Sequence, residues 1–174
     1  MNKKVVKEIF SWIAVLAGGV AAAFLISNFV IVNASVPTGS MMDTIPERSR
    51  IVAFRLSYLF SDPQRFDIVV FRYPGDESKL YVKRIVGIPG DVVEITGGVV
   101  YINGQAIYEE YLREDPRPPY NHGPFHVPED SYFMLGDNRN RSEDSRAWRD
   151  PFVRQDQILG RVIFSYFPSV RVIR

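Results

Sequence analysis

A run of 24 residues without a charged side chain, from Ile9 to Val32, limits what this chain of 174 residues can fold into. As a helix the run would extend about 36 Å, which exceeds the hydrocarbon core of a bilayer at roughly 30 Å. A buried helix of a soluble protein normally carries a polar stripe with a period near 3.6 residues, and this run has no such stripe. The sequence therefore predicts a transmembrane anchor helix at residues 9–32.

The charges before this run predict its orientation. Lys3, Lys4 and Lys7 precede it, and positive charge is retained on the cytoplasmic side of a membrane. A cleaved signal peptide is the alternative, because Val32-Asn33-Ala34 resembles a cleavage site, but the apolar region of such peptides spans only about 7–15 residues. We therefore predict a single-pass plasma-membrane protein with a cytoplasmic segment at residues 1–8 and an extracytoplasmic domain at residues 33–174.

The composition of the chain excludes several kinds of function. After the first eight residues, 18 basic side chains face 19 acidic ones, so no basic surface for nucleic acid is expected. Without cysteine the chain has no disulfide, thiolate nucleophile or cysteine-based zinc site. Its two histidines, His122 and His126, lie in a stretch rich in Pro, Gly and Asn, where surface loop residues are expected. We predict no metal site and no cofactor.

Beyond residue 33 the sequence changes to short runs rich in β-branched and aromatic residues, which are typical of strands. Gly97-Gly98 and Asn103-Gly104 are two-residue hairpin signals between or after such runs. Residues 113–130 contain five prolines and are expected to form an irregular connection. No long amphipathic helix is predicted, so the fold class is mostly β, with an antiparallel sheet. The runs lie at residues 50–55, 66–73, 79–88, 91–96, 99–102, 131–137 and 160–167.

Lys83 is a candidate general base. Strand alternation places it on one face with Tyr81 and Ile85, where an aromatic and an aliphatic side chain would desolvate the amine. Burial disfavours the ammonium and lowers a lysine pKa from about 10.4, so that a neutral amine becomes available to a serine hydroxyl. The alternative is an edge-strand lysine that discourages aggregation.

Two polar segments could complete such a site. Thr38-Gly39-Ser40 follows the anchor closely, and is either an ordinary linker or a turn that presents a nucleophile. Residues 135–150 are dense in Asp, Asn, Arg and Ser, which is typical of a charged surface loop. In the alternative interpretation, Asp137, Arg139, Asp144 and Arg146 form one ion network that shapes a cleft wall.

Four motifs, "GSMMDT", "FDIVVF", "YVKRIVGIPGD" and "GDNRNRSEDSR", occur in an order that resembles the bacterial type I signal peptidases. The resemblance covers essentially the whole chain, anchor included. It implies that Ser40 is the nucleophile and Lys83 the general base. The resemblance also implies that the N–H of Ser40 and the hydroxyl of Thr38 form the oxyanion hole.

The last motif carries three further roles in the family. The resemblance implies that Ser142 orients the lysine amine, and that Asp144 and Arg146 form a structural ion pair beside it. One departure is visible, because Asp43 stands where the family commonly has proline. About fifty residues separate Lys83 from Gly136, which resembles the short form of the family with a single anchor.

These patterns favour a membrane-bound serine endopeptidase that removes signal peptides from exported preproteins. Its partners would be preproteins with small residues before the cleavage site, and membrane lipid, but no nucleic acid. Eight residues separate Val32 from Ser40, at most about 26–29 Å of extended chain, so the nucleophile would stay close to the membrane. Two other hypotheses are a membrane-tethered β domain that binds exported chains without chemistry, and a self-cleaving regulator. The regulator would be expected to carry a DNA-binding part, which the uncharged span does not offer.

Overall fold

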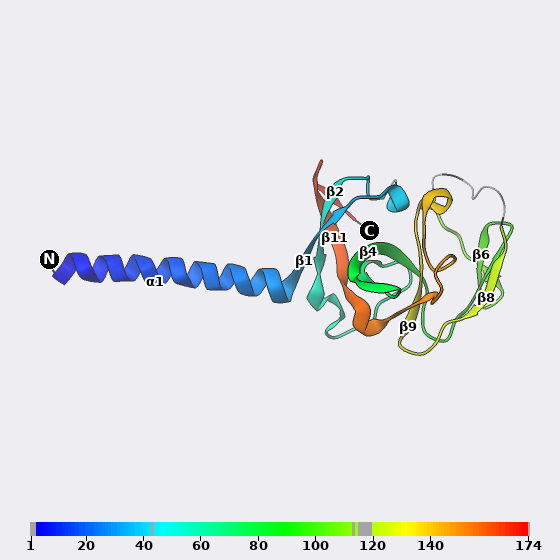
Figure 1. Cartoon of the computed structure of the whole chain (residues 1–174), viewed down its shortest axis with the longest axis horizontal. Helices are drawn as coiled ribbons and strands as arrows, with labels where there is room; N and C mark the ends of the chain where they lie inside the picture. Colours follow the sequence, from blue (N-terminus) through cyan, green and yellow to red (C-terminus); the bar gives the residue numbers. More distant parts are fainter. Residues whose placement is uncertain (1–2, 43, 113, 115–119, 174) are drawn as a thin grey trace.

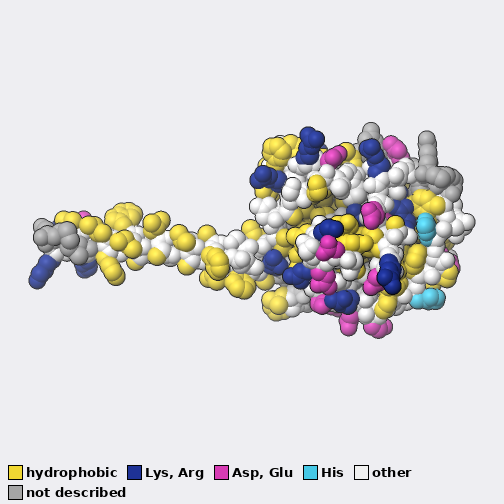
Figure 2. Space-filling model, in the orientation of Figure 1, with side chains coloured by type: hydrophobic (Ala, Val, Ile, Leu, Met, Phe, Trp, Pro, Cys, Tyr) yellow, Lys and Arg dark blue, Asp and Glu magenta, His cyan; other side chains and the backbone are white. Residues whose placement is uncertain are grey.

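One long helix and two antiparallel sheets make up the computed structural model, which describes residues 3–42, 44–112, 114 and 120–173. Helix α1, Lys3–Leu25, continues into a π-helical turn, η1, Ile26–Val30. Together they project away from the β domain, and apolar side chains cover them along their length (Figures 1 and 2). The 28 residues are long and apolar enough to cross a membrane, and their most apolar window has none of its residues buried in the protein.

The helix differs from its predicted bounds at both ends. It begins at Lys3 rather than at residue 9, and helical conformation ends at Val30 rather than at Val32. Ile31 and Val32 belong instead to strand β1, Ile31–Val36, which pairs with β2, Ser49–Phe54, along its whole length. The cross-strand hydrogen bonds and the burial of Val32 in the core outweigh the apolar composition that extended the prediction.

The larger sheet holds eight strands, with the order β1-β2-β11-β3-β4-β9-β10 and β12 paired to β11. Every ladder in it is antiparallel, which confirms the predicted fold class. Its other strands are β3 (Ile68–Tyr73), β4 (Asp76–Gly87), β9 (Ser131–Leu135), β10 (Phe152–Arg154), β11 (Ile158–Phe167) and β12 (Arg171–Val172).

The smaller sheet has four strands in the order β7-β6-β5-β8. Both predicted hairpins are confirmed in it. Gly97-Gly98 joins β5, Val92–Thr96, to β6, Val99–Ile102, and Asn103-Gly104 joins β6 to β7, Gln105–Ala106. All four turn residues have positive φ, which is the conformation that such two-residue turns require.

Strand β8, His122–His126, corrects part of the prediction of an irregular connection at residues 113–130. Residues 113 and 115–119 of that connection lie outside the described residues. Strand β8 pairs with β5 alone, and an edge strand of this kind tolerates the proline at position 124 that argued against a strand. His122 is half-buried and His126 is exposed, which agrees with the predicted surface position, although both belong to a strand.

Strand β4 connects the regions that matter for the site. Its second half, Val82–Gly87, is buried, because β3 pairs with it as far as Arg84, β9 pairs with it from Arg84 to Gly87, and apolar clusters pack on both faces. A side chain on this half of the strand is therefore removed from water whichever way it points. Turns that follow β1 and β9 lie beside it and complete the candidate site.

Candidate active site

The turn that carries the predicted nucleophile Ser40, residues 38–41, is called the nucleophile turn here and begins where β1 ends. Thr38 is still extended, and Gly39–Met41 then form one 3₁₀ turn, η2, closed by a hydrogen bond of 3.2 Å from the Met42 N–H to the Gly39 carbonyl oxygen. Met41 is fully buried in the core and anchors the turn, and only 5% of Ser40 is exposed. The small-residue stretch is therefore a fixed turn and not a loose linker.

Lys83 reaches this turn from the middle of β4, where it lies opposite Val69 of β3. Its amine donates a hydrogen bond of 2.6 Å to the hydroxyl oxygen of Ser40. Only 4% of the lysine is exposed, and its Nζ lies 5.6 Å from the centre of the Tyr81 ring, as strand alternation predicted. The structure thus brings together the two residues predicted as nucleophile and base.

Burial is the main cause that lowers the pKa of Lys83 from 10.5 to about 8. The carboxylates of Asp144, Glu143 and Asp137 oppose this shift, and the Arg146 guanidinium reinforces it. With this pKa an appreciable fraction of the amine is neutral under mildly alkaline conditions, and a neutral amine can accept a proton from a serine hydroxyl.

Two donors lie beside the hydroxyl of Ser40. The Thr38 hydroxyl is 3.5 Å from the Ser40 Oγ. The N–H of Ser40 donates to no acceptor within the described part of the chain. Both groups are thus near the atom that would attack a carbonyl carbon, and neither has a strong internal partner.

Ser142 is packed against Gly136 behind the dyad. A methyl group at Gly136 would lie 2.1 Å from the Ser142 Oγ and 2.6 Å from the carbonyl oxygen of Ser40, so only glycine fits there. The Ser142 Oγ is buried and has no hydrogen-bond partner among the described residues. The hydrogen bond to Lys83 that the family resemblance implies is not among the contacts of the structure.

The predicted ion pair between Asp144 and Arg146 is present. The guanidinium donates from Nε and Nη2 to both carboxylate oxygens, at 2.7 and 2.8 Å, and both side chains are buried. Asp144 also accepts a hydrogen bond of 3.0 Å from the N–H of Gly136. The pair therefore holds the loop that carries Gly136.

Neither interpretation of residues 135–150 is correct for the charges of this segment. Asp137, Arg139 and Asp144 are buried, unlike residues of a solvated surface loop, and the alternative of one ion network with Arg146 is wrong. Asp137 pairs with Arg84 of β4, and Arg139 pairs with Glu109, so three separate ion pairs replace one cluster. Arg84 and Arg139 each donate to both oxygens of a carboxylate that lies outside their own segment, and this two-oxygen geometry favours those pairs over one shared cluster. Arg146 still contacts Arg139, through a hydrogen bond of 3.0 Å to its carbonyl oxygen.

Neither of these outside partners was predicted. Arg84 donates to both oxygens of Asp137 at 2.8 and 2.7 Å and stacks 3.9 Å from the Tyr111 ring. Strand alternation indicated only that Arg84 opposes Lys83 on β4, and no local signal connected Glu109 with Arg139, thirty residues away.

An open cleft of about 280 Å³ lies over the dyad. The end of β1 with the nucleophile turn forms one wall, β4 forms the other, and charged side chains of the 136–146 loop border it. The residues that line it are Ser35, Val36, Pro37, Thr38, Ser40, Leu80, Tyr81, Val82, Lys83, Arg141 and Glu143.

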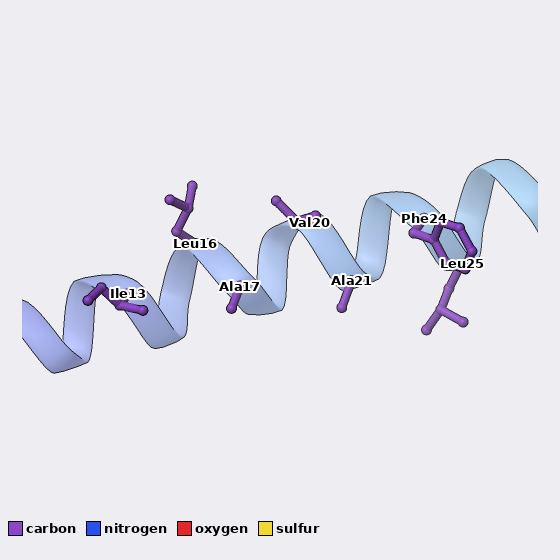
Figure 3. Close-up of a pocket in the computed structure, with 7 residues that line it drawn as sticks. All are labelled: Ile13, Leu16, Ala17, Val20, Ala21, Phe24 and Leu25. Carbon is purple, nitrogen blue, oxygen red and sulfur yellow. The ribbon is translucent and has the colours of Figure 1, made fainter.

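A second hollow lies on helix α1 and is lined by Ile13, Leu16, Ala17, Val20, Ala21, Phe24 and Leu25 (Figure 3). All of its lining side chains are apolar and come from the helix itself, so it has no groups for chemistry. Among the described residues, no cluster of three or more His, Asp or Glu side chains could hold a metal ion.

A buried serine hydroxyl bonded to a buried amine of lowered pKa, at the base of an open cleft, has the geometry of a serine hydrolase site of the Ser-Lys kind. Comparisons with known proteins identify the family. The family described as "Signal peptidase, peptidase S26" matches residues 9–167.

Individual relatives agree with this match. The chain is 37% identical to a probable signal peptidase I-1 of Synechocystis, over 91% of this chain and 83% of the relative. It is 36% identical to signal peptidase I S of Bacillus subtilis, over 93% and 91% of the two chains. A crystal structure of a signal peptidase I from Enterococcus faecalis superposes with a TM-score of 0.50 at 36% identity, covering 58% of this chain and 97% of that one.

The chain therefore belongs to the signal peptidase family S26. It is a membrane-anchored serine peptidase that cleaves signal peptides. The one departure from the family pattern, Asp43, lies outside the described residues.

Proposed function

We propose that the peptidase acts through a dyad in which Ser40 is the nucleophile and Lys83 the general base. One observation carries the proposal. The amine and the hydroxyl are 2.6 Å apart, and both are almost completely buried. A buried amine with a pKa near 8 can take the serine proton, whereas a solvated lysine would hold its own proton at neutral pH.

In the first half of the reaction, the neutral Lys83 amine accepts the proton of the Ser40 hydroxyl as Oγ attacks the scissile carbonyl carbon. The Ser40 N–H and the Thr38 hydroxyl stabilise the negative oxygen of the tetrahedral intermediate. The Lys83 ammonium then gives its proton to the leaving amine, and an acyl-enzyme remains.

In the second half, a water molecule attacks the acyl carbon while Lys83 again accepts a proton. The same proton returns to the Ser40 oxygen as the acyl bond breaks, which restores the hydroxyl. Ser142 would orient the amine through its unpartnered hydroxyl, while Asp144 and Arg146 act indirectly by holding the loop.

The substrate would be a preprotein whose extended segment before the cleavage site lies in the cleft between the end of β1 and β4. Both walls are extended backbone, so the segment can add to them as a further strand, with shallow space for alternate small side chains. The anchor would hold residues 1–8 in the cytoplasm and the β domain outside, in the plasma membrane, where preproteins emerge. Enzyme and substrate then share one bilayer, which raises their effective concentration.

Replacement of each dyad residue tests the mechanism. Ser40→Ala removes the nucleophile, and Lys83→Arg keeps the charge but offers no neutral amine, because guanidinium stays protonated. Each variant, purified in detergent, should give no processing of a precursor by mass measurement of the new N-terminus. Cleavage by Lys83→Arg above that of Ser40→Ala would contradict the dyad, and equal residual cleavage in both would indicate a contaminating peptidase.

The absence of cysteine allows a matched rescue. Lys83→Cys introduces a single thiol, which 2-bromoethylamine converts into a side chain of nearly lysine length that ends in an amine. We expect processing to return after this alkylation but not after alkylation with iodoacetamide, which adds an amide. Equal rescue by both reagents would show that an amine is not required at this position.

The orientation of the anchor has its own test. Protease added outside intact spheroplasts should digest the β domain, while an epitope fused before Lys3 stays protected until the cells are lysed. Protection of the β domain in intact spheroplasts would overturn the proposed topology, without any effect on the dyad.

A further inference from the structure

Asn138 lies directly behind the nucleophile turn and bonds it twice. Its backbone N–H donates a hydrogen bond of 3.0 Å to the carbonyl oxygen of Ser40. Its side-chain Nδ2 donates a second one of 3.1 Å to the carbonyl oxygen of Gly39, which also accepts the 3.2 Å hydrogen bond from the Met42 N–H that closes the turn. These two carbonyls belong to the peptide units on either side of Ser40, so a single residue restrains the backbone before and after the nucleophile.

The bond to Gly39 has a consequence for Ser40. The carbonyl of Gly39 and the N–H of Ser40 belong to the same planar trans peptide unit, in which they point in opposite directions. Restraining the carbonyl therefore also restrains the direction of the N–H. Because Asn138 lies on the carbonyl side, the N–H points away from it.

The side away from Asn138 is the substrate cleft. Ser40 and Thr38 line that cleft, whereas Asn138 lines a neighbouring hollow, which shares Arg141 with the cleft. Asn138 therefore does not contact the substrate position. The N–H of Ser40, which has no acceptor among the described residues, is left facing the position where a carbonyl oxygen would sit.

Asn138 is itself held firmly. Its neighbour Asp137 is paired to Arg84 on β4, and its other neighbour Arg139 donates to Glu109 and to the Gly136 carbonyl oxygen. The Arg141 N–H donates a 3.0 Å hydrogen bond to the carbonyl oxygen of Asn138. A residue anchored on both sides in this way can hold a turn in place.

We infer that Asn138 is a positioning residue for the oxyanion hole, because its side-chain amide fixes the Gly39–Ser40 peptide unit and so directs the Ser40 N–H at the developing oxyanion. The inference rests on the proposed function of Ser40. Asn138 would thus help to stabilise the transition state and would not contribute to substrate binding. Loss of the amide should therefore lower kcat and leave KM nearly unchanged.

Asn138→Asp tests this role, because it keeps the size of the side chain and replaces the donor by an oxygen that repels the Gly39 carbonyl. Misdirecting one oxyanion donor is expected to lower kcat by about 10- to 100-fold. Asn138→Ser removes the same donor without adding charge and should lower kcat in the same range. Gln64→Glu is the matched control, since Gln64 also donates from a side-chain amide to a backbone carbonyl, that of Asp62, but on an exposed loop.

A second measurement distinguishes misdirection of the Ser40 N–H from a general loss of folded structure. A peptide aldehyde adds to the Ser40 oxygen and places its former carbonyl oxygen in the oxyanion hole, whereas the matching peptide alcohol only occupies the cleft. In the Asn138 variants the aldehyde should bind about 10- to 100-fold more weakly and the alcohol within about threefold of the wild type. The ratio of these affinities does not depend on the fraction of folded enzyme.

The outcomes divide cleanly. A kcat within about threefold of the wild type in a folded variant, or equal weakening of aldehyde and alcohol, would overturn the role of Asn138. Cleavage by the Ser40→Ala variant at a rate near that of the wild type would instead overturn the proposed function. A loss confined to kcat and to the aldehyde, and absent from Gln64→Glu, supports the inference.

Discussion

Lys83 and Arg84 are neighbours on β4, and the fold buries both cations to 4% and 3% exposure. Their surroundings differ. Arg84 has a carboxylate partner, Asp137, which accepts from two of its nitrogens. Lys83 has no carboxylate within ion-pair distance among the described residues, and its amine meets the hydroxyl of Ser40.

The comparison shows how one strand serves two purposes. A guanidinium stays protonated even when buried, and its counter-ion makes it a structural cross-link between β4 and the 136–146 loop. An amine without a counter-ion loses its proton more easily, which suits it to accept one from serine. Strand alternation points the two residues in opposite directions, so that consecutive residues have separate tasks.

The largest expected contrast is in stability. Arg84→Met leaves the buried Asp137 carboxylate without its counter-ion, with a hydrogen bond from the Thr44 hydroxyl remaining, and should lower the free energy of unfolding by about 3–5 kcal/mol. Lys83→Met removes an amine whose folded pKa of about 8 lies below its unfolded value of 10.5. Below pH 8 the folded state bears the full cost of the buried ammonium, so at pH 7 this variant should be more stable than the wild type, by up to about 3 kcal/mol.

Urea unfolding of the full chain in detergent, followed by the fluorescence of the buried Trp148, measures this contrast. The advantage of Lys83→Met should shrink as the pH rises from about 8 to 10.5, because the wild type then loses the charge before the unfolded chain does. Lys83→Met should also have no peptidase activity. Equal destabilisation by the two substitutions would contradict the proposed difference between Arg84, which has a counter-ion, and Lys83, which has none among the described residues.

The next largest effect is a loss of turnover on substitution of Thr38, beside the Ser40–Lys83 pair. Thr38→Val keeps the shape of the side chain and removes its hydroxyl, and loss of one oxyanion donor typically lowers turnover on the order of 10²–10³-fold. Thr38→Ser keeps the donor and should retain most of the rate. With one precursor at saturating concentration, a Val variant within about threefold of the Ser variant would show that Thr38 is only a turn residue.

A smaller loss of turnover is expected when a methyl group is added at Gly136, in the 136–146 loop. Gly136→Ala places a methyl group against the Ser142 side chain and the Ser40 carbonyl oxygen, so Ser40, the proposed nucleophile, must shift. A shift of about 1 Å lowers turnover by roughly 10²-fold. The matched control is Gly160→Ala, where the methyl group meets the Phe54 carbonyl oxygen at 2.6 Å, away from the site.

The two glycine variants should differ in what they lose. Gly160→Ala is expected to lower the melting temperature and to leave kcat per folded molecule near that of the wild type. Gly136→Ala should lower kcat at temperatures where it is fully folded. If both variants lose kcat alike, the tight packing at Gly136 has no special role in catalysis.

Much of this fold was predictable because its signals are local. The Gly97-Gly98 and Asn103-Gly104 turns require positive φ, and that requirement is written in the residues themselves. The bounds of the anchor were less predictable, because Ile31 and Val32 are as apolar as the helix that precedes them. What removes them from the helix is pairing with Phe54 and Ala53, which are distant in the sequence.

Some residues of the site were predictable from the sequence and others were not, for the same reason. Ser40 and Lys83 stood out through their surroundings and through the family motifs, and the structure joins them. The partners of Asp137 and Arg139 did not stand out, because the pairing of Arg84 and Glu109 with them depends on which elements the fold brings together. Composition alone suggested that the loop charges pair with one another, and only Asp144 and Arg146 do.

The most direct test of the dyad is the pH dependence of kcat/KM for one precursor peptide, with the full chain in detergent, between pH 6 and 10. This parameter reports the ionisation of the free enzyme, and the base must be neutral to act. A rising limb with a midpoint near pH 8 is expected, because burial lowers the pKa of Lys83 to about 8. A rate that is independent of pH from 6 to 9, or a midpoint near the unperturbed lysine value of about 10.4, would contradict a neutral Lys83 as the base that activates Ser40.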